Sequence, residues 1–330
     1  MKITMAHGSG GKATSELISE IFAKNFNDPV LDRMEDSAVV PGCAKIAVTT
    51  DSFVVTPLFF PGGDIGHLAV CGTVNDLAVS GAYPRYLSVG MIIEAGFEME
   101  TLVRIVKSIA MTAKEAGVSI VTGDTKVVEG GSADGIFINT AGVGVFTAER
   151  PPLPQKIAPG DKIIISGYMA SHGMAIMAAR ENMGFNPPLE SDVAPIAALV
   201  DRVLQGGGKV NAMRDPTRGG VAATLCEWVT RNTDIAIYDS MLPVRPDVSA
   251  ACEILGMDPL YIANEGIMLM SVSAPDAEQA LISLHSVACG KNAAIIGEVK
   301  KGGGDVYAVT DYGTKRKIMM PQGEILPRIC

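Results

Sequence analysis

The sequence predicts a mixed α/β (α+β) protein with two domains, and three observations lead to this fold class. The chain has 330 residues, about twice the roughly 150 that a single domain commonly takes. Apolar runs of strand length alternate with segments whose apolar residues recur at helical spacing. A proline-rich run at 150–154 interrupts both patterns, because proline disrupts strand ladders and helix interiors alike. We therefore expect a first domain at 1–150, a second at 151–320 and a flexible tail at 321–330.

Each domain is predicted to combine strands and helices. In the first domain, apolar spacing indicates helices near 17–22 and 102–113 and strands at 46–50, 86–93, 118–122 and 136–146. In the second, it indicates strands at 162–166, 235–238, 267–272 and 293–299 and helices near 172–182, 196–204, 220–230 and 276–287.

Composition and charge exclude several classes of protein. Apolar residues make up 48% of the chain and charged residues 19%, which argues against disorder. The net charge of −9 is the wrong sign for a nucleic-acid surface. The chain has neither the roughly 18-residue apolar run of a membrane helix nor the apolar core of a secretion signal at its start. Its 6 cysteines lack CxxC spacing, so we expect reduced thiols in the cytoplasm, with no nucleic acid and no membrane bound.

Four aspartates share one kind of position, at the end of an apolar run: Asp36, Asp51, Asp76 and Asp124. Carboxylates at such positions can converge on a hard cation, and Mg²⁺ typically takes one or two carboxylates together with phosphate oxygens. Asp76 interrupts a small-residue segment that otherwise looks buried, where an unpaired charge is costly. Each aspartate taken alone could instead cap a helix or a turn. The four together favour a metal site.

The segment HGSGGK at 7–12 precedes the first predicted helix. Backbone N–H groups in a glycine turn at a helix start can cradle an anion, and a lysine adds charge. We expect Gly8, Gly10, Gly11 and Lys12 to bind the phosphates of a nucleotide triphosphate that magnesium bridges. The glycine spacing differs from that of a Walker A motif, and a flexible N-terminus is the alternative.

A second candidate anion site is the segment RDPTRGG at 214–220, which opens a predicted helix. Asp215 and Thr217 can cap that helix, and Gly219 allows an anion to approach the backbone closely. Arg218, with the other arginine of the segment, could clamp a phosphate in a forked geometry.

Two further residues are candidates for proton transfer. Lys126 lies two residues after Asp124 and could act as a second cation or, with a lowered pKa, as a base; a solvated lysine at a strand end is the alternative. Glu265 precedes a strand that looks buried and could be an acid/base or orienting group, or simply a carboxylate in a turn.

The tail is the most informative segment, because the chain ends in Cys330. Prolines at 321 and 327 oppose regular structure, and chain ends are usually mobile. Ten extended residues span at most about 33–36 Å, enough to carry a thiol between two sites. Cysteine can hold a transferable group through a thioester-like bond. We therefore expect Cys330 to accept a transferable group and to carry it between two sites, although an incidental terminal thiol is the alternative.

Taken together, these motifs resemble the HypE family of hydrogenase maturation factors. The resemblance runs along the whole chain and is carried by HGSGGK, EDSAVV, TTDSFVV, VNDLAVSGA, TGDTKVV, RDPTRGG, NEG and the terminal PRIC. The acidic motifs are shared with the wider superfamily of aminoimidazole ribonucleotide synthetase, selenophosphate synthetase and thiamine-phosphate kinase. The tail that ends in cysteine narrows the resemblance to the HypE family.

The resemblance implies a fold and a reaction. The N-terminal domain would pair with its copy in a homodimer through a β-barrel-like sheet, followed by a C-terminal α/β domain. The carbamoyltransferase HypF would place a carbamoyl group on Cys330, and the tail would fold into an ATP site of the same protein. ATP would phosphorylate the carboxamide oxygen, phosphate would leave, and a thiocyanate would remain. The nitrile would pass to iron on the HypC–HypD complex as a cyanide ligand of [NiFe] hydrogenase.

The resemblance also implies roles for single residues. Asp36, Asp51, Asp76 and Asp124 match magnesium-binding positions, and Asp215 matches a further acidic position that faces the nucleotide. Lys126 matches a residue that assists deprotonation of the carboxamide nitrogen, with Asp76 and Glu265 as supporting acid/base groups. The implied cofactors are ATP and Mg²⁺.

Two other functions remain open on the sequence. One is a different ATP-dependent amide- or phosphate-activating enzyme of the superfamily. Selenophosphate synthetase would carry a reactive cysteine in the glycine-rich N-terminal region, but no cysteine precedes Cys43, and a ribonucleotide synthetase has no use for such a tail. The other is a non-catalytic carbamoyl carrier, which predicts no ATP turnover.

Overall fold

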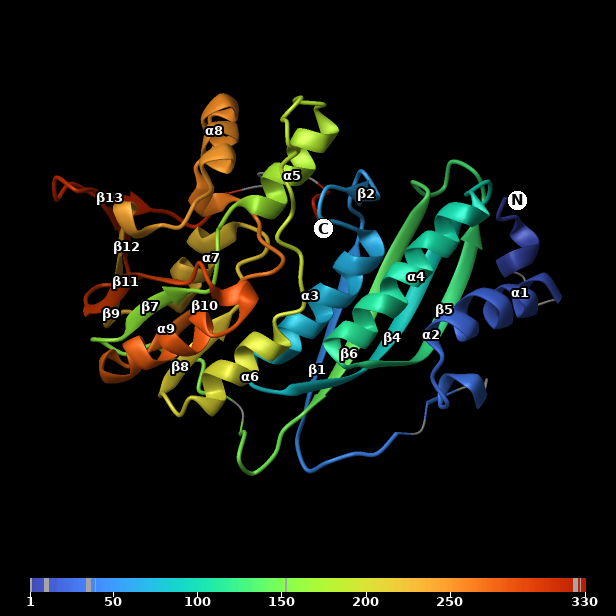
Figure 1. The fold of residues 1–330 in the computed structure, drawn as a ribbon, viewed down its shortest axis with the longest axis horizontal. Helices are drawn as coiled ribbons and strands as arrows, with labels where there is room; N and C mark the ends of the chain where they lie inside the picture. The colour runs from blue at the N-terminus through green and yellow to red at the C-terminus, as the bar shows by residue number, and fades with distance from the viewer. Residues whose placement is uncertain are drawn as a thin grey trace.

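Two β-sheets, each packed against helices, organise the computed structural model (Figure 1). The structure describes residues 2–8, 12–33, 37–38, 40–151, 153–322, 326 and 328–330. The strands of the first sheet lie between 46 and 145 and those of the second between 162 and 318. The mixed α/β class predicted from the sequence is confirmed. In the described residues, no helix is long and apolar enough to span a membrane.

The first sheet has four strands in the order β1 (Ile46–Phe53), β6 (Ile136–Val145), β4 (Tyr83–Glu94) and β5 (Ser119–Val128). Strands β4 and β5 are parallel because α4 (Met99–Ala116) connects them, and a parallel pair needs such a crossover. Helix α4 ends at Gly117, which adopts the left-handed conformation that favours glycine. Within one chain this sheet is open, with β1 and β5 at its edges.

Helix α3 (Ile65–Val79) packs between the first sheet, α4 and the second half of the molecule. It begins at Asp64, whose side chain accepts hydrogen bonds from the backbone N–H groups of Gly66 and His67. Nearly all of its residues are buried, so it has no polar face. The sequence analysis predicted no helix here, because helical periodicity is visible only when one face is solvated.

The face of the first sheet turned away from α3 carries exposed apolar side chains. Ile46, Val48 and Ile92 are 52%, 67% and 44% exposed. Along β1 exposed residues alternate with less exposed ones, since successive side chains of a strand point to opposite faces. One face of the sheet thus packs on α3 and the other presents an apolar surface.

The second sheet has seven strands in the order β13 (Lys315–Ile318), β12 (Val306–Val309), β9 (Thr233–Tyr238), β11 (Ala294–Lys301), β7 (Lys162–Ile165), β10 (Leu269–Val272) and β8 (Val210–Arg214). All neighbouring pairs are antiparallel except β9 with β12. The helices of this half are α5 (Ser171–Arg180), α6 (Ala197–Gln205), α7 (Gly220–Trp228), α8 (Pro246–Leu255) and α9 (Ala277–His285).

Shorter elements complete the chain. The N-terminal segment contains α1 (Lys12–Leu17), a π-helical turn η2 (Ile18–Ala23) and α2 (Lys24–Phe26), and a small hairpin joins β2 (Phe59–Phe60) to β3 (Gly63–Asp64). Single 3₁₀ turns are η1 (Met5–Gly8), η3 (Leu31–Arg33), η4 (Asp239–Met241), η5 (Pro259–Tyr261), η6 (Ala274–Asp276) and η7 (Ala288–Gly290).

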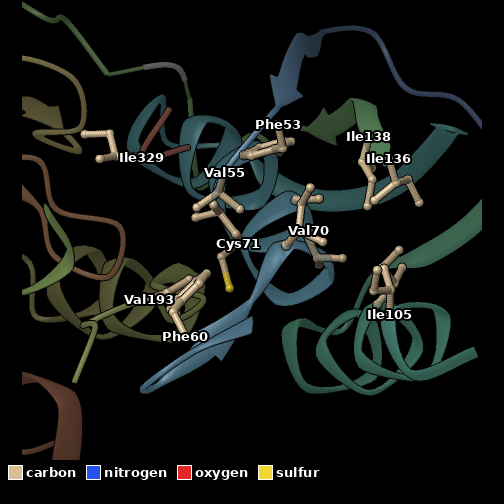
Figure 2. Close-up of a cluster of buried hydrophobic side chains, with 14 of the residues drawn as sticks. Phe53, Val55, Phe60, Val70, Cys71, Ile105, Ile136, Ile138, Val193 and Ile329 are labelled. Carbon is tan, nitrogen blue, oxygen red and sulfur yellow. The ribbon is translucent and has the colours of Figure 1, made fainter. Parts of the chain in front are cut away.

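The hydrophobic core of the first half continues into the second half and into the tail (Figure 2). Phe53, Val55 and Cys71 pack in one cluster with Val193 of the second half and with Ile329. Ile329 is only 4% exposed. The described end of the chain is therefore part of the core, although the sequence predicted a mobile tail from its prolines.

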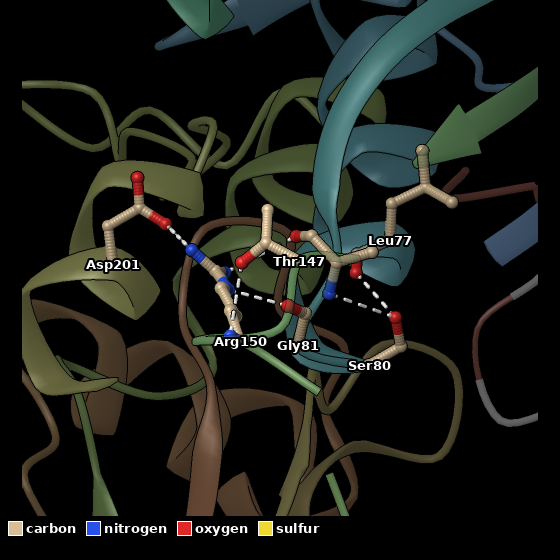
Figure 3. A network of polar contacts seen from close by, with 7 residues as sticks. Leu77, Ser80, Gly81, Thr147, Arg150 and Asp201 are labelled. Atoms are coloured by element: carbon tan, nitrogen blue, oxygen red, sulfur yellow. Dashed lines mark hydrogen bonds and ion pairs between the residues drawn. The ribbon is translucent and has the colours of Figure 1, made fainter. Parts of the chain in front are cut away.

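Arg150, at the predicted domain joint, connects the two halves through a buried side chain (Figure 3). Its guanidinium donates to the carbonyl oxygens of Gly81 and Ala82 and pairs with Asp201 of α6. It also lies 4.0 Å from the ring centre of Tyr83. The contacts of one side chain therefore hold the start of β4 against α6.

Candidate active site

A cavity of about 190 Å³ lies where the first sheet meets the second half of the chain, and seven of the predicted site residues line it. Strand β1 supplies Asp51, α3 supplies Asp76, and the segment between β8 and α7 supplies Asp215, Thr217 and Arg218. The remaining lining residues include Glu265, which precedes β10, and Cys330 of the tail. Segments far apart in the sequence thus meet at one point.

Asp51 and Asp76 approach each other from β1 and α3. The Thr49 hydroxyl, two residues before Asp51 and on the same strand face, donates a hydrogen bond of 2.6 Å to Oδ2 of Asp76. Burial raises the pKa of the Asp51 carboxyl, the nearby Asp76 carboxylate raises it further, and Arg218 lowers it. The two carboxylates therefore repel each other inside the cavity.

Asp215 and Glu265 complete the acidic wall. Burial raises the pKa of Asp215 to about 7, and the Asp76 and Asp51 carboxylates also raise it. Glu265 is 3% exposed, and burial, followed by the charge of Asp215, raises its pKa well above the ordinary value. At neutral pH this cavity therefore retains protons on carboxyl groups that would be ionised in water.

Hydrogen bonds from other residues to the Glu265 backbone hold this residue in place. Its N–H and that of Gly266 donate to Oδ2 of Asp192, at 3.1 and 2.9 Å. The Asn75 side chain of α3 donates to the Glu265 carbonyl oxygen at 3.1 Å. A Cβ at position 266 would come within 1.7 Å of the Asp192 carbonyl oxygen, so only glycine fits after Glu265. These contacts fix where the Glu265 side chain enters the cavity.

The RDPTRGG segment turns sharply before α7, and the residue at the N-cap is Gly219, so the expected capping by Asp215 or Thr217 was wrong. Gly219 and Gly220 have φ of 78° and 61°, which glycine adopts readily. A Cβ at Gly220 would lie 2.6 Å from the carbonyl oxygens of Leu260 and Ile262. The turn presents Arg218 to the cavity, with Nη1 3.7 Å from Sγ of Cys330.

The described end of the tail is docked into the molecule by hydrogen bonds to its main chain. The backbone N–H groups of Val54 and Thr56, just past β1, donate to the carbonyl oxygens of Cys330 and Arg328 at 3.1 and 3.2 Å. The Arg328 Nε donates back to the Val54 carbonyl oxygen at 3.0 Å. The tail therefore pairs with the continuation of β1 and carries its thiol beside Asp51.

Two side chains of α5 also hold the tail. Nε2 of His172 lies 2.7 Å from the Ile329 carbonyl oxygen, and the Arg180 guanidinium donates to the Arg328 carbonyl oxygen at 2.8 Å. The sequence analysis did not identify His172, Arg180 or Arg328 as functional. The only signal available was their position, in a predicted helix and in the tail, which does not indicate a contact.

The environment of Cys330 suppresses its ionisation in the docked position. Burial raises the pKa of this thiol to about 12, with a further increase from the Glu265 charge, although Arg218 lowers it. The docked sulfur is therefore a protonated thiol at neutral pH and a poor nucleophile.

Asp124 and Lys126 lie on β5, away from this cavity. Asp51 of β1 pairs with Thr140 of β6, which pairs with Val89 of β4. Val89 pairs with Gly123 of β5, next to Asp124. Three strand spacings separate the two edges, about 14 Å in all. Because Asp124 follows Gly123, it points to the opposite face from Asp51. A single chain does not bring these aspartates together.

Asp124 instead lines a second cavity, of about 300 Å³, together with Thr14 of α1 and Ser37. Of the predicted phosphate-binding residues, Gly8 ends η1 and Lys12 begins α1. Gly10, Gly11 and Asp36 lie outside the described residues. The described N-terminal residues that line this cavity, Thr14 and Ser37 among them, thus lie at the β5 edge of the first sheet.

The donor set of the first cavity suits a magnesium ion that phosphate oxygens help to hold. Within the described ranges, no three His, Cys, Asp or Glu side chains form a ready-made metal cage. Burial, followed by the charge of Asp76, nevertheless raises the pKa values of the crowded Asp51 and Asp215 carboxyls, and a divalent cation would relieve the repulsion among these groups. Mg²⁺ commonly binds through one or two carboxylates plus substrate phosphates.

The chain is similar to known proteins along nearly its whole length. The AIR synthase related protein N-terminal and C-terminal domain models match residues 34–146 and 158–309. Carbamoyl dehydratase HypE of Escherichia coli is 47% identical over 99% of both chains. A putative hydrogenase expression/formation protein of Methanocaldococcus jannaschii is 47% identical over 100% of both chains.

Solved structures extend the likeness to three dimensions. A crystal structure of hydrogenase maturation protein HypE in complex with ATP superposes with a TM-score of 0.94 at 42% identity and covers 99% of both chains. A chain of a HypE–HypF complex has a TM-score of 0.80 at 48% identity and covers 92% of this chain and 99% of that one.

Proposed function

Because this chain belongs to the HypE carbamoyl dehydratases of the AIR synthase related family, we propose that its substrate is a carbamoyl group on its own Cys330. It is an ATP-dependent enzyme of hydrogenase maturation. The reaction converts the S-carbamoyl cysteine and ATP into an S-cyano cysteine, ADP and phosphate, and supplies the cyanide ligands of [NiFe] hydrogenase.

The observation that carries this proposal is the position of the Cys330 sulfur. It lines the cavity that Asp51, Asp215 and Glu265 also line. A carboxamide on that sulfur would extend into the same space. Tethering makes the reaction intramolecular, with an effective concentration in the millimolar range or above.

The atoms of the reaction balance as follows. The carboxamide oxygen attacks the γ-phosphorus of ATP, ADP leaves, and the nitrogen loses one proton. The carbon–oxygen bond then breaks, phosphate departs with the oxygen, and the nitrogen loses its second proton as the nitrile forms. Phosphorylation is needed because an amide oxygen is a poor leaving group, whereas phosphate is a good one. Cations that neutralise the transferring phosphoryl group lower the barrier.

We assign charge neutralisation to two sets of residues. Asp51, Asp76 and Asp215 would hold Mg²⁺, which supplies positive charge next to the phosphate oxygens. Arg218 is placed to contact a phosphoryl group near the sulfur, and its planar guanidinium suits phosphate. Thr217 and Gly219 shape the same turn. Glu265, with its raised pKa, would hold a proton and donate a hydrogen bond to the carboxamide.

The remaining predicted residues favour a homodimer. Ile46, Val48 and Ile92 form an exposed apolar surface, and Lys126 pairs in register with Ile92 and so shares that sheet face. Association of two copies through this face would bury the apolar residues and close the open sheet. It would also place Asp124 and Lys126 of one copy against the other, where Lys126 could take the carboxamide proton.

The tail has to leave the cavity to be loaded. A docked thiol with a pKa of about 12 is a poor acceptor, so carbamoylation by HypF belongs to an undocked state. One of the similar structures is a HypE–HypF complex, which supports HypF as the donor. We propose the HypC–HypD complex as the acceptor of the nitrile. A thiol that must stay reduced favours a cytoplasmic location.

ATP turnover tests the proposal. Protein carbamoylated at Cys330 and mixed with ATP and Mg²⁺ is expected to release ADP and phosphate, one equivalent of each per carbamoylated chain. Cys330→Ser should release neither, whereas Cys289→Ser, a change at an exposed cysteine elsewhere, should behave like the wild type. Equal ADP release without the carbamoyl group would contradict the proposal.

A further inference from the structure

His172 lies in a hydrogen-bond network in which the donor and the acceptor of each bond can be assigned. Its Nε2 lies 2.7 Å from the Ile329 carbonyl oxygen, which can only accept, so Nε2 carries the proton. Its Nδ1 lies 2.8 Å from the Ser191 hydroxyl. That hydroxyl oxygen already accepts from the N–H of Val193 at 3.0 Å, which leaves its hydrogen to donate to Nδ1. One chain of donors thus runs from Val193 through Ser191 and His172 to the tail.

The surroundings hold this imidazole in one orientation and one protonation state. His172 is fully buried, and the Phe60 ring packs edge-on against it with 5.6 Å between ring centres. Burial lowers the pKa of His172 to about 4, so the ring is neutral at neutral pH and Nδ1 remains an acceptor. The Ser191 N–H donates to the Pro61 carbonyl oxygen at 2.9 Å, which ties the connection to the β2–β3 hairpin.

Fixing the Ile329 carbonyl fixes almost all of Cys330. The peptide unit is planar, so the carbonyl sets the positions of the Cys330 nitrogen and Cα. The Cys330 carbonyl oxygen is held separately by the Val54 N–H. With both ends held, the sulfur can move mainly by rotation about χ1, which has three staggered positions. One of these brings Sγ to 3.7 Å from Arg218.

We infer that His172, oriented by Ser191, is a positioning residue for the dehydration step: it holds the Ile329 carbonyl and so keeps the group on the Cys330 sulfur inside the carboxylate cavity. The inference rests on the function proposed above. The contacts of His172, Val54 and Thr56 are all to tail main-chain oxygens, so the docking they provide is the same for the free thiol, the carbamoyl form and the cyano form. Among the polar contacts of the described residues, Arg218 is the one that touches the sulfur.

Because His172 holds the main chain of the tail, replacing it should slow dehydration without changing ATP binding. His172→Leu introduces an apolar side chain of similar bulk and removes the donor to Ile329, so the tail docks less often and less uniformly. The single-turnover rate of dehydration should fall about tenfold, the effect of one lost buried hydrogen bond. The affinity for ATP should stay unchanged. The rate at which HypF carbamoylates Cys330 should stay unchanged or rise, because the undocked thiol is the acceptor.

The experiment compares four proteins that carry a carbamoyl group on Cys330. They are the wild type, His172→Leu, His172→Gln, whose amide can still donate to the Ile329 carbonyl, and His285→Leu. The last is a control at a more exposed histidine, because Nε2 of His285 also lies 3.0 Å from a carbonyl oxygen, that of Ala293, away from the tail. Ser191→Ala is a fifth protein; it removes only the orienting hydroxyl and keeps the test available if His172→Leu does not fold.

The outcomes separate this inference from the proposed function. Slower dehydration in His172→Leu and Ser191→Ala, recovery in His172→Gln, and wild-type ATP affinity support the positioning role. Faster modification of the free Cys330 thiol by a thiol reagent in the same two variants, measured before carbamoylation, adds independent support. Wild-type dehydration rates in both His172→Leu and Ser191→Ala overturn the inference and leave the function intact. Absence of dehydration in the wild type would instead overturn the proposed function.

Discussion

The Arg218 guanidinium lies 3.7 Å from the sulfur of Cys330, and these residues are 112 positions apart in the chain. The contact exists because the glycine turn before α7 and the docked tail reach the same cavity from different directions. Arg218 lowers the pKa of Cys330, Glu265 and Asp51, so it is the cation that three groups of the cavity share.

Replacing Arg218 should impair the chemical step. Arg218→Met removes both the charge and the forked donors that suit a phosphoryl group, and we expect the rate of ADP release from the carbamoylated protein to fall at least about tenfold. Arg218→Lys keeps the charge without the forked donors, so its rate of ADP release should lie between those of the wild type and Arg218→Met. Arg316→Met, which breaks an exposed ion pair with Asp258, serves as the control and should match the wild type.

Removing a carboxylate from the cavity should weaken the binding of ATP with magnesium. Asp76→Asn takes away one potential ligand, and calorimetry should show about a tenfold loss of affinity with Mg²⁺ and little change without it. Asp124→Asn should have the same effect if β5 of a second copy contributes. Asp311→Asn is a change of equal charge at an exposed position. Equal affinities for all four proteins would remove Asp76 and Asp124 from the metal site.

Asp215 should make the stability of the ligand-free protein depend on pH. Its folded pKa of about 7 exceeds the unfolded value of about 3.9, so the folded state binds the extra proton between these values. Stability is therefore present at low pH and decreases as pH rises from about 4 to about 7. Asp215→Asn removes this contribution, so its melting temperature should exceed that of the wild type at about pH 8. Parallel melting curves across that range would contradict the assignment.

Arg150 should contribute strongly to stability. Arg150→Met keeps much of the side-chain volume but leaves the Gly81 and Ala82 carbonyls and Asp201 without their partner (Figure 3). We expect the free energy of unfolding to fall by about 2–4 kcal/mol, measured by denaturant titration. Lys2→Met, at an exposed ion pair with Glu98, should cost well under about 1 kcal/mol. Equal losses of unfolding free energy in the two variants would show that the buried contacts of Arg150 stabilise the protein no more than an exposed ion pair does.

Helices with one solvated face were easier to predict from the sequence than a helix that is buried on all sides. Helix α4 was predicted because Leu102, Val106 and Ile109 recur at helical spacing, and the structure buries all three. Helix α3 was missed because it is apolar all round. Strand β8 and helix α8 were also not predicted, although they are at least as long as the predicted β7 and α5. Periodicity reports the contrast between core and solvent, not burial itself.

The acidic cavity could be predicted in part. Asp51, Asp76, Asp215 and Glu265 each adjoin an apolar run or a glycine turn, and they do meet. The separation of Asp124 could not be foreseen, because strand order across the sheet depends on long-range pairing. The residues that dock the tail, His172 and Arg180, act through main-chain oxygens of a distant segment, and such contacts leave no pattern in the sequence.

The mass of the C-terminal peptide tests the central claim most directly. The protein is carbamoylated at Cys330, incubated with ATP and Mg²⁺, and digested. We predict that the peptide containing Cys330 loses the mass of one water, and that the loss requires ATP and accompanies the release of one ADP. A peptide that keeps the full carbamoyl mass while ATP is bound and intact would contradict the account.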